Sequence, residues 1–348
     1  MGDTLLRVKD LRVHFPATRS WQEALHGERP VIRSVDGINL EIKRGEIFCL
    51  VGESGCGKST TGKAILRLVT PTTGEIYYQG QSLYQLTRSA FRPYRRRLQM
   101  IFQDPFSSLD PAQTIQEIVA EGLAVHGLYP GRRERRDRVL QALDEAGLRP
   151  AKTFLHRYPH ELSGGQRQRV VIAGALILEP EFIVADEPVS ALDLSVRAEI
   201  IQLLLQLREK RGLTFLFITH DLALAKLIGD RLAVMYLGKI METGTAASII
   251  DQPLNPYTKA LVSVIPSLHP VSPEQRLLLQ GEIPNPRHIP AGCRFHPRCP
   301  VAQQEKCEVL EPPLELKQDD RYVACHLVPR PEGYVTPGIW EKRSRGTS

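Results

Sequence analysis

Residues 52–59 combine glycines, a lysine and a serine in an order that can bind the phosphates of a nucleotide. They read Gly-Glu-Ser-Gly-Cys-Gly-Lys-Ser and match the pattern G-x-x-x-x-G-K-[ST]. Glycines allow backbone dihedrals closed to other residues, so successive N–H groups can point at phosphate oxygens. Lys58 could reach the β- and γ-phosphates, and the Ser59 hydroxyl could bind Mg²⁺. The nucleotide contacts expected here are Gly52, Ser54, Gly55, Cys56, Gly57, Lys58, Ser59 and Thr60, with the Cys56 side chain as a small filler.

The sequence on either side of this loop predicts the elements that would hold it. Residues 47–51 form an apolar run of buried-strand length, and residues 60–68 are rich in helix formers. A helix that begins at the loop adds unpaired N–H donors and the positive end of its dipole. A glycine-rich turn that binds nothing is the structural alternative. The succession of strand, glycine loop and helix favours a nucleotide site.

Two carboxylates follow a second apolar run. Phe182–Ala185 is apolar, and Asp186 and Glu187 come directly after it. A parallel strand would deliver both acids to the carboxyl edge of the sheet, next to the phosphate loop. Asp186 could then hold Mg²⁺, directly or through water, and Glu187 could orient and deprotonate an attacking water. A strand that ends in two solvated acids is the alternative, and it is a poor one with a phosphate loop upstream.

A second helix start in the chain could also bind an anion. Leu162–Gln166 reads Leu-Ser-Gly-Gly-Gln and precedes the apolar stretch Val170–Leu178. A serine and two glycines ahead of a helix leave N–H groups free to face a phosphate. If the two helix starts lie far apart, one nucleotide cannot use both from a single chain. We therefore expect a head-to-tail dimer, in which each nucleotide touches one helix start from each subunit.

Apolar runs alternate with helix-length segments up to about residue 250, which predicts βαβ units and a mostly parallel sheet. The expected strands are Leu5–Phe15, Ile38–Ile42, 47–51, Leu98–Phe102, 182–185 and 214–218. The expected helices are 60–68, Ile115–Val125, Arg135–Ala146, Val170–Leu178 and Leu192–Arg208. Prolines become frequent after Asp251, which predicts a loop-rich extension. We expect a nucleotide-binding domain over residues 1–250 with a helical insertion at about 105–165, an extension over 251–340 and a tail over 341–348.

Between about residues 5 and 250 the chain resembles the ATP-binding cassette (ABC) family. The resemblance rests on six motifs in family order: the phosphate loop 52–59, Gln103, the Leu162–Gln166 signature, Asp186-Glu187, Ser190–Asp193 and His220. It implies a P-loop NTPase fold that hydrolyses Mg-ATP. It also implies that Gln103 senses Mg²⁺ and contacts the coupling helices of a transporter, and that His220 holds the γ-phosphate and the attacking water. Ser163 and Gly165 would serve the γ-phosphate on the partner subunit, and Gln166 and Asp193 would add nucleotide contacts.

The resemblance is less specific at the adenine site and in the signature helix. Phe15 aligns best with the aromatic residue that stacks on adenine, with Trp21 as a rival, because residues 16–30 look like an insertion. Many family members have an arginine where this chain has Gly174. A glycine inside a helix costs about 1 kcal/mol relative to alanine, so we expect that helix to be less rigid.

Composition is ordinary for a globular protein of 348 residues, with 45 basic and 39 acidic residues and a formal charge of +6. The apolar run 170–178 is shorter than the roughly 18 residues of a membrane helix, and the start carries no secretory pattern. We therefore expect the chain to be made and kept in the cytosol. Two arginine clusters lie at 92–97 and 132–138, and a solvated helix face is the better interpretation of the second. A nucleic-acid patch, or attraction to a nearby anionic membrane, is the alternative.

Four cysteines of the extension are spaced C-x5-C-x7-C-x17-C at Cys293, Cys299, Cys307 and Cys325. Disulfides are disfavoured in a reducing cytosol, and four thiolates in a loop-rich segment suit a metal ion or an iron–sulfur cluster. Zinc is the main rival, with His296 and His326 as substitute ligands. Four unrelated cysteines are the alternative, because no C-x2-C pair anchors the pattern.

The extension resembles the C-terminal region of the ATPases of dipeptide and oligopeptide importers. The similarity is carried by Asn255–Thr258, Gly281–Pro284, Gly292–Phe295 and Ala324-Cys325. This resemblance implies a [4Fe-4S] cluster on the four cysteines. It also implies an energy-coupling subunit at the cytoplasmic face of the inner membrane, peripheral to it. Its expected partners are a second, related ATPase subunit, two transmembrane permeases and an extracytoplasmic substrate-binding protein, with no nucleic acid.

Three other functions stay open from the sequence. Related importers carry other ligands, such as nickel complexes or sugars. A soluble ABC ATPase acting on nucleic acid or ribosomes usually has two cassettes or a long coiled coil, whereas this chain has one cassette and no sustained heptads. A regulatory protein that binds ATP without hydrolysing it would have no use for Glu187 and His220.

Overall fold

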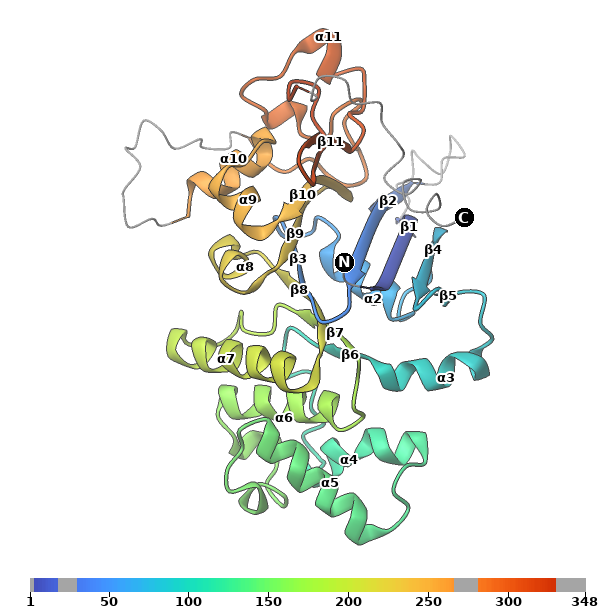
Figure 1. Cartoon of the computed structure of the whole chain (residues 1–348), viewed down its shortest axis with the longest axis vertical. Coiled ribbons are helices and arrows are strands. Elements are labelled where there is room, and N and C mark those ends of the chain that lie inside the picture. The colour runs from blue at the N-terminus through green and yellow to red at the C-terminus, as the bar shows by residue number, and fades with distance from the viewer. Residues whose placement is uncertain (1–2, 18–29, 266–280, 330–348) are drawn as a thin grey trace, which may run out of the picture.

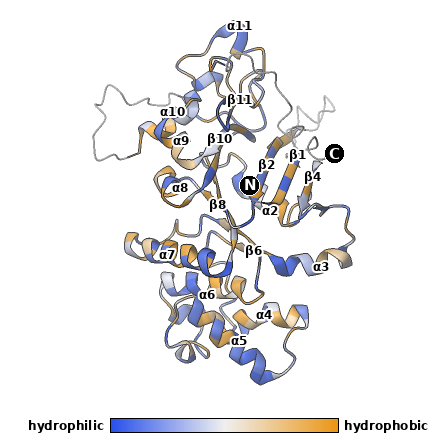
Figure 2. Cartoon of the chain, in the orientation of Figure 1, coloured by the Kyte–Doolittle hydropathy of each residue, from blue (hydrophilic) through white to orange (hydrophobic). Residues whose placement is uncertain are grey.

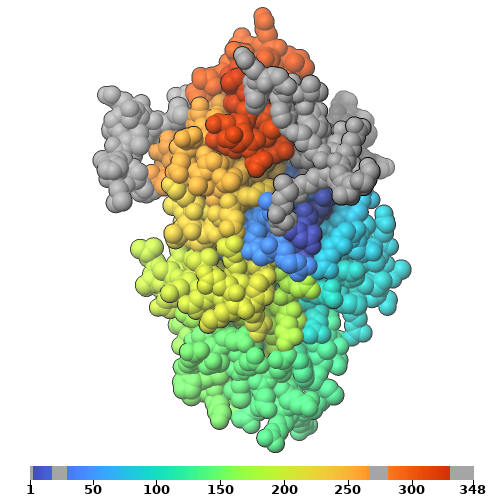
Figure 3. All heavy atoms as spheres, in the orientation of Figure 1, coloured from blue at the N-terminus to red at the C-terminus, as the bar shows by residue number. Residues whose placement is uncertain are grey.

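The computed structural model describes residues 3–17, 30–265 and 281–329. Its strands occupy the middle of an elongated molecule (Figure 1). Helices α4 (Ile115–His126), α5 (Arg132–Glu145) and α6 (Gly164–Leu176) form one end, and residues 281–329, which include α11 (Gln304–Cys307), form the other. The space-filling view in Figure 3 shows these C-terminal residues, in orange and red, directly above the yellow segment that precedes them. The phosphate loop and the two carboxylates predicted above fall in the central part.

The strands are β1 (Thr4–Pro16), β2 (Val31–Lys43), β3 (Ile47–Val51), β4 (Thr73–Tyr78), β5 (Gln81–Ser82), β6 (Leu98–Ile101), β7 (Phe182–Asp186), β8 (Thr214–Thr219), β9 (Arg231–Tyr236), β10 (Lys239–Thr245), β11 (Glu315–Gln318) and β12 (Arg321–Val323). The α-helices are α2 (Lys58–Ile65), α3 (Arg88–Arg97), α4 (Ile115–His126), α5 (Arg132–Glu145), α6 (Gly164–Leu176), α7 (Leu194–Arg211), α8 (Leu222–Ile228), α9 (Ala246–Asp251), α10 (Pro256–Ser263) and α11 (Gln304–Cys307). Short 3₁₀ turns are η1 (Ala151–Thr153), η2 (Pro159–Glu161) and η4 (His296–Arg298).

The main sheet has the strand order β11-β12-β10-β9-β3-β8-β7-β6. Strands β9, β3, β8, β7 and β6 run parallel to one another, and β10 pairs antiparallel with β9. A second, antiparallel sheet has the order β2-β1-β4-β5. The expected α/β fold with a mostly parallel core sheet is therefore confirmed. The last two strands of the extension, β12 and β11, continue the main sheet beyond β10.

The main sheet separates two apolar cores because successive side chains of a strand point to opposite faces. On β3, Cys49 and Val51 belong to one core, which includes residues of helices α4 to α7. Phe48 and Leu50 of the same strand belong to the other core, which includes residues of β1, β2 and β4. Strand β3 is buried along its whole length, as expected for a central parallel strand. Figure 2 shows apolar residues on several strands and polar residues over much of α5.

Helix boundaries follow local capping signals. Helix α4 begins after Thr114, whose side chain accepts a hydrogen bond from the Glu117 N–H while the Glu117 carboxylate accepts one from the Thr114 N–H. The helix ends at Gly127, which has the left-handed conformation that favours glycine. The predicted helices at 115–125 and 135–146 correspond to α4 and α5. The predicted helices at 60–68 and 192–208 correspond to α2 and α7, with shifted ends.

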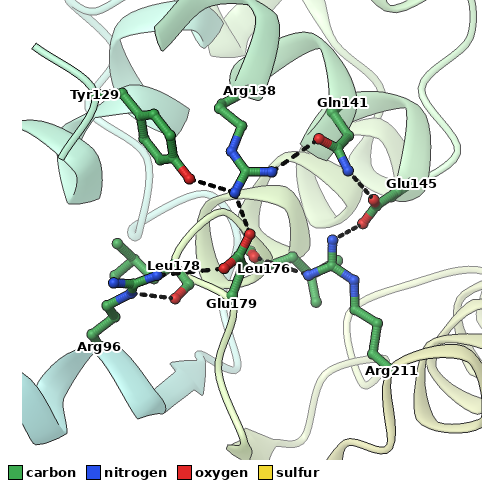
Figure 4. Close-up of polar contacts among 9 residues, drawn as sticks. All are labelled: Arg96, Tyr129, Arg138, Gln141, Glu145, Leu176, Leu178, Glu179 and Arg211. Atoms are coloured by element: carbon green, nitrogen blue, oxygen red, sulfur yellow. Dashed lines mark hydrogen bonds and ion pairs between the residues drawn. The ribbon is translucent and has the colours of Figure 1, made fainter. Parts of the chain in front are cut away.

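A polar network, drawn in Figure 4, joins helices α3, α5, α6 and α7 to one another. Glu179, which follows α6, is paired with Arg96 of α3 (3.4 Å) and with Arg138 of α5. The network continues along α5 to Arg211, the last residue of α7, which also donates to the Leu176 carbonyl (3.3 Å). Arg96 and Arg138 come from the two arginine clusters, so part of each cluster makes structural contacts, including the second cluster, for which the sequence favoured a solvated helix face.

Some sequence predictions lie outside the described residues. They include Trp21, most of the proposed insertion at 16–30, and the tail over 341–348. Among the described residues no helix combines the length and apolar composition needed to cross a bilayer.

Candidate nucleotide-binding and hydrolysis site

The phosphate loop joins β3 to α2, as the sequence predicts. Gly52 has a φ of 152° and Gly57 a φ of 107°. A Cβ atom on Gly52 would lie 2.2 Å from the Met235 carbonyl oxygen, and one on Gly57 would lie 2.1 Å from the Ser34 carbonyl oxygen. Both positions therefore exclude any residue with a side chain. The loop packs tightly against β2 and β9, which fixes the direction of its N–H groups.

Lys58 opens helix α2 and is buried. Its ammonium group donates to the carbonyl oxygens of Gly52 (2.8 Å) and Glu53 (2.9 Å), so it is held against the loop. Cys56 is also buried, and burial raises the pKa of its thiol. A buried, neutral thiol fits the expectation that Cys56 fills space. Thr60 is held from β2 by the Ser34 hydroxyl, which donates to its hydroxyl oxygen at 2.9 Å.

Two of the three side chains expected to bind Mg²⁺, Ser59 and Asp186, touch each other. The Ser59 hydroxyl donates to the Asp186 carboxylate at 2.8 Å. Burial raises the pKa of the Asp186 carboxyl, although the Ser59 hydrogen bond and the Lys63 charge act in the opposite direction. A divalent cation would favour the ionised form of this buried acid. A hydroxyl and a carboxylate are oxygen ligands of the kind that Mg²⁺ prefers, so the residues present fit the ion.

Two residues from separate segments, Gln103 and His220, meet at the Glu187 carboxylate. Gln103 donates to one of its oxygens through Nε2 (3.1 Å), and Nδ1 of His220 lies 3.2 Å from the other. The Glu187 side chain is 16% exposed, whereas His220 is 62% exposed. Glu187 has a φ of 45°, a conformation that is uncommon and costly for a non-glycine residue. The arrangement brings together the three residues predicted to be catalytic.

The signature segment begins helix α6 with a capping box. The Ser163 hydroxyl accepts from the Gln166 N–H (3.3 Å), and the Gln166 side chain accepts from the Ser163 N–H (3.1 Å). Ser163 is exposed at this helix start. A Cβ atom on Gly165 would lie 2.4 Å from a methyl group of Val196 of α7, so a side chain at this position would force Val196 to shift. Helix α6 packs on α4, α5 and α7, whereas α2 packs on strands β1, β2, β7 and β8.

Two further predicted contacts lie at the edges of this region. Asp193 is exposed and precedes α7, and its neighbour Ser190 bonds to the Glu187 carbonyl through both its N–H (3.2 Å) and its hydroxyl (3.1 Å). Phe15 lies near the end of β1, opposite Ile32, with 37% of its surface exposed. Phe15 as the adenine-stacking residue stays a prediction.

The four cysteines of the extension are free thiols that line one small pocket together with His296 and His326. Burial raises the pKa of Cys293 to about 11 and also raises the pKa of Cys299. Over the described residues, no three His, Cys, Asp or Glu side chains are grouped so that they could hold a metal ion. The cysteines thus gather in space, as a shared site requires, without forming a ligand cage in this conformation.

Sequence reasoning missed that the extension contacts the phosphate loop. Arg298 pairs with both oxygens of the Glu53 carboxylate, and the Tyr257 hydroxyl accepts a hydrogen bond from the Glu53 N–H. The only available signal was weak: a carboxylate inside a phosphate-binding loop needs a cation to offset its charge.

Comparison with known proteins agrees with this geometry. Residues 35–190 match the family model described as ABC transporter, and residues 241–307 match the model described as oligopeptide/dipeptide transporter, C-terminal region. The putative oligopeptide transport ATP-binding protein YkfD of Bacillus subtilis is 48% identical over 325 residues, which cover 93% of this chain and 95% of that protein. The chain belongs to the ABC transporter family.

Other relatives of this ABC protein support the same assignment. The oligopeptide transport ATP-binding protein AppF of Bacillus subtilis is 44% identical, covering 93% of this chain and 98% of that protein. A solved dimer of the ATP-binding cassette MJ0796, in a post-hydrolysis state with ADP and Pi, is 32% identical with a TM-score of 0.60. The match covers 70% of this chain and 99% of the solved chain. The protein is therefore an ATPase of the ABC type, and its hydrolysis of ATP is coupled to transport, which implies permease partners.

Proposed function

We propose that this protein is the energy-coupling ATPase of an importer for dipeptides or oligopeptides. The observation that carries the proposal is the meeting of Gln103, Glu187 and His220 beside the phosphate loop, in a chain whose C-terminal region matches that of oligopeptide and dipeptide transporters. Binding of ATP would close a head-to-tail dimer, and hydrolysis would reopen it. That cycle would drive alternating access in the permeases. Importers of nickel or sugar are the alternative within the same architecture.

The proposed roles at the hydrolysis site follow from position. Lys58 and the loop N–H groups bind the phosphates, and Mg²⁺, when bound by Ser59, Gln103 and Asp186, screens their charge. Glu187 is the general base that orients and deprotonates the attacking water. His220 holds the γ-phosphate and that water.

The second half of each nucleotide site comes from another subunit. The exposed Ser163, the N–H of Gly165, Gln166 and Asp193 would contact the nucleotide bound on the partner. Support comes from the separate placement of α2 and α6 and from the dimeric state of the solved cassette. We propose a related but different chain as that partner, with an extracytoplasmic substrate-binding protein in the full complex. The assembly would lie at the cytoplasmic face of the inner membrane.

The permeases would dock in a groove between α4 and α6. This groove has a volume of about 280 Å³, and its lining includes Val125 and Phe102, the residue that precedes Gln103 in the chain. Phe102 is 42% exposed and Val125 59% exposed, and both line the same groove, whereas exposed apolar residues that are scattered singly are common on protein surfaces. Gly174 also lines the groove, with open space where its Cβ atom would be. An apolar helix end from a permease would cover these side chains.

Co-purification tests this proposal. We expect the chain, isolated from membranes, to carry two permeases, and the change Val125→Asp to lower their recovery about tenfold or more by placing a charge in an apolar contact. Leu227→Asp on α8 is the matched control, since Leu227 is 77% exposed but lies outside the groove. Recovery of the permeases should be unchanged in this control. If no membrane protein accompanies the wild-type chain under any nucleotide condition, the importer function is wrong.

We also propose domain boundaries and a role for the cysteines. The nucleotide-binding domain would span residues 1–250 with the helical part at about 105–165, followed by the extension at 251–340 and the tail at 341–348. Cys293, Cys299, Cys307 and Cys325 would hold a [4Fe-4S] cluster, with zinc as the alternative. Their shared pocket supports this, and a bound metal would keep the thiols ionised in spite of burial. Such a group would cross-link the loops of the extension.

Metal analysis of protein purified without oxygen decides between these options. We expect a brown protein with about four iron and four sulfide per chain. The variant Cys307→Ser should lose most of the iron, whereas Cys49→Ser, in the buried strand β3, should retain it. Zinc in place of iron would identify the alternative. A colourless protein that contains neither metal would refute a metal site on these cysteines.

A further inference from the structure

The turn formed by residues 293–299, called here the cysteine turn, carries two arginines that reach the nucleotide site. Arg298 forms a two-pronged ion pair with Glu53 of the phosphate loop, with distances of 2.8 and 3.1 Å between guanidinium nitrogens and carboxylate oxygens. The Arg298 side chain is 6% exposed and that of Glu53 is 21% exposed. A paired guanidinium and carboxylate in this geometry fix each other in orientation as well as in distance.

The surroundings of Arg298 hold Glu53 at a second point. Tyr236, Tyr257 and Phe295 pack against one another, with ring centroids 4.7 to 5.5 Å apart. The Tyr257 hydroxyl accepts a hydrogen bond from the Glu53 N–H at 3.2 Å. Lys58 donates to the carbonyl oxygen of the same residue. Glu53 is thus held by the extension on one side and by Lys58 on the other.

The second arginine reaches the other end of the loop. Arg294 is buried, donates to the Leu237 carbonyl and is paired with Asp36 of β2. The neighbouring Gly238 N–H donates to the Cys56 carbonyl at 2.9 Å, and its own carbonyl accepts from the Asp36 N–H at 3.0 Å. Arg294 therefore fixes the short β9–β10 turn that holds Cys56. Arg294 directly follows Cys293, and Arg298 directly precedes Cys299, so each arginine is next to a cysteine at one end of the turn.

We propose that the cysteine turn sets the conformation of the phosphate loop, with Arg298 as a positioning residue for ATP. The inference needs only the ATPase site and does not depend on the transported ligand or on a metal. Loop N–H groups bind phosphate well only when their directions are right, so releasing Glu53 weakens ATP binding more than it slows the chemical step. A change in the packing of the cysteine pocket would then alter ATP affinity through Arg298.

A double-mutant cycle on the full-length chain tests the contact. We expect Arg298→Met and Glu53→Gln each to raise the Kd for ATP and the KM about tenfold, with kcat at saturating ATP within about threefold of wild type. The Kd for ATP of the double variant should be no higher than that of the weaker-binding single variant, because the two substitutions remove the same interaction. Glu53→Gln is nearly isosteric and partly exposed, so it decides the question even if Arg298→Met does not fold.

The matched control is Arg321→Met. Arg321 makes a similarly buried ion pair in the same extension, with Glu242 of β10 at 2.5 Å. It should lower the melting temperature while leaving the Kd for ATP unchanged. If the Arg298 and Glu53 variants behave like this control, with reduced stability and unchanged ATP affinity, Arg298 only anchors the extension and the proposal fails.

The link to the cysteine pocket has its own test. Cys299 directly follows Arg298 in the chain. Cys299→Ser should therefore raise the Kd for ATP several-fold when Arg298 is present. In the Arg298→Met background the same change should have no further effect on the Kd. Equal effects in both backgrounds would show that the pocket does not act through Arg298. These measurements use ATP and the purified chain alone, so they stay informative even if the importer function is wrong.

Discussion

Replacement of Glu187 by glutamine should reduce steady-state ATP hydrolysis by about 100-fold or more while ATP binding is retained. An amide keeps the size of the carboxylate and can still accept the hydrogen bond from Gln103, which is 3.1 Å long in this structure. It cannot accept a proton from water, and loss of a general base costs about 10²–10⁴-fold in rate. Phosphate release and equilibrium ATP binding, measured on the same preparation, separate the two effects.

Glu181→Gln provides a control from the other end of the same strand. Glu181 precedes β7 and bonds to Tyr78 and Arg44, away from the hydrolysis site. Its replacement should leave hydrolysis within about threefold of wild type, since loss of a partly exposed ion pair has a small effect. Unchanged hydrolysis in Glu187→Gln would remove Glu187 as the general base. Loss of ATP binding in that variant would give the residue a structural role instead.

Replacement of Lys58 by alanine should weaken ATP binding about 100-fold and abolish hydrolysis at millimolar ATP. The Lys58 ammonium group is buried against the loop and would transfer its hydrogen bonds from the Gly52 and Glu53 carbonyls to phosphate oxygens. Hydrogen bonds to charged groups contribute about 1.5–3 kcal/mol each, and about 1.4 kcal/mol corresponds to a tenfold change in Kd. Titration with a fluorescent ATP analogue measures the change directly.

The control for the lysine is Lys226→Ala, which removes a half-exposed lysine of α8 that is paired with Asp251. ATP affinity should not change in this variant. Since alanine at position 58 also removes a buried cation, a folding check by circular dichroism accompanies the titration. Folded Lys58→Ala protein that binds ATP with wild-type affinity would contradict the assignment of the phosphate loop.

The phosphate loop and Glu187 could be predicted because the sequence patterns that indicate them are local. The phosphate loop lies between an apolar run and a helix, and Glu187 follows a buried strand, so each position could be inferred from a few neighbouring residues. The meeting of Gln103 and His220 at Glu187 followed from parallel strands that end at one sheet edge. These contacts needed the topology of the sheet but no detail of side-chain packing.

The extension was harder to predict for a physical reason. Arg298 and Glu53 are 245 residues apart, and no local pattern indicates which buried arginine meets which carboxylate. Strands β11 and β12 have four and three residues, and they lie in a proline-rich segment that reads as loop. The cysteine spacing could be read as a metal site, an iron–sulfur site or no site. The structure brings the thiols to one pocket and leaves the choice to metal analysis.

The pairing of β12 with β10 has a consequence for how the chain tolerates being cut. Without β12, the N–H and C=O groups of β10 on that side would face solvent and could template pairing with a second molecule. The Glu242 carboxylate of β10 would also lose its ion pair with Arg321 and the hydrogen bonds from the Leu254 and Asn255 N–H groups. A cassette truncated near residue 250 should therefore aggregate and not persist as an independently folded ATPase. The last two strands shield the edge of the main sheet from pairing with other molecules.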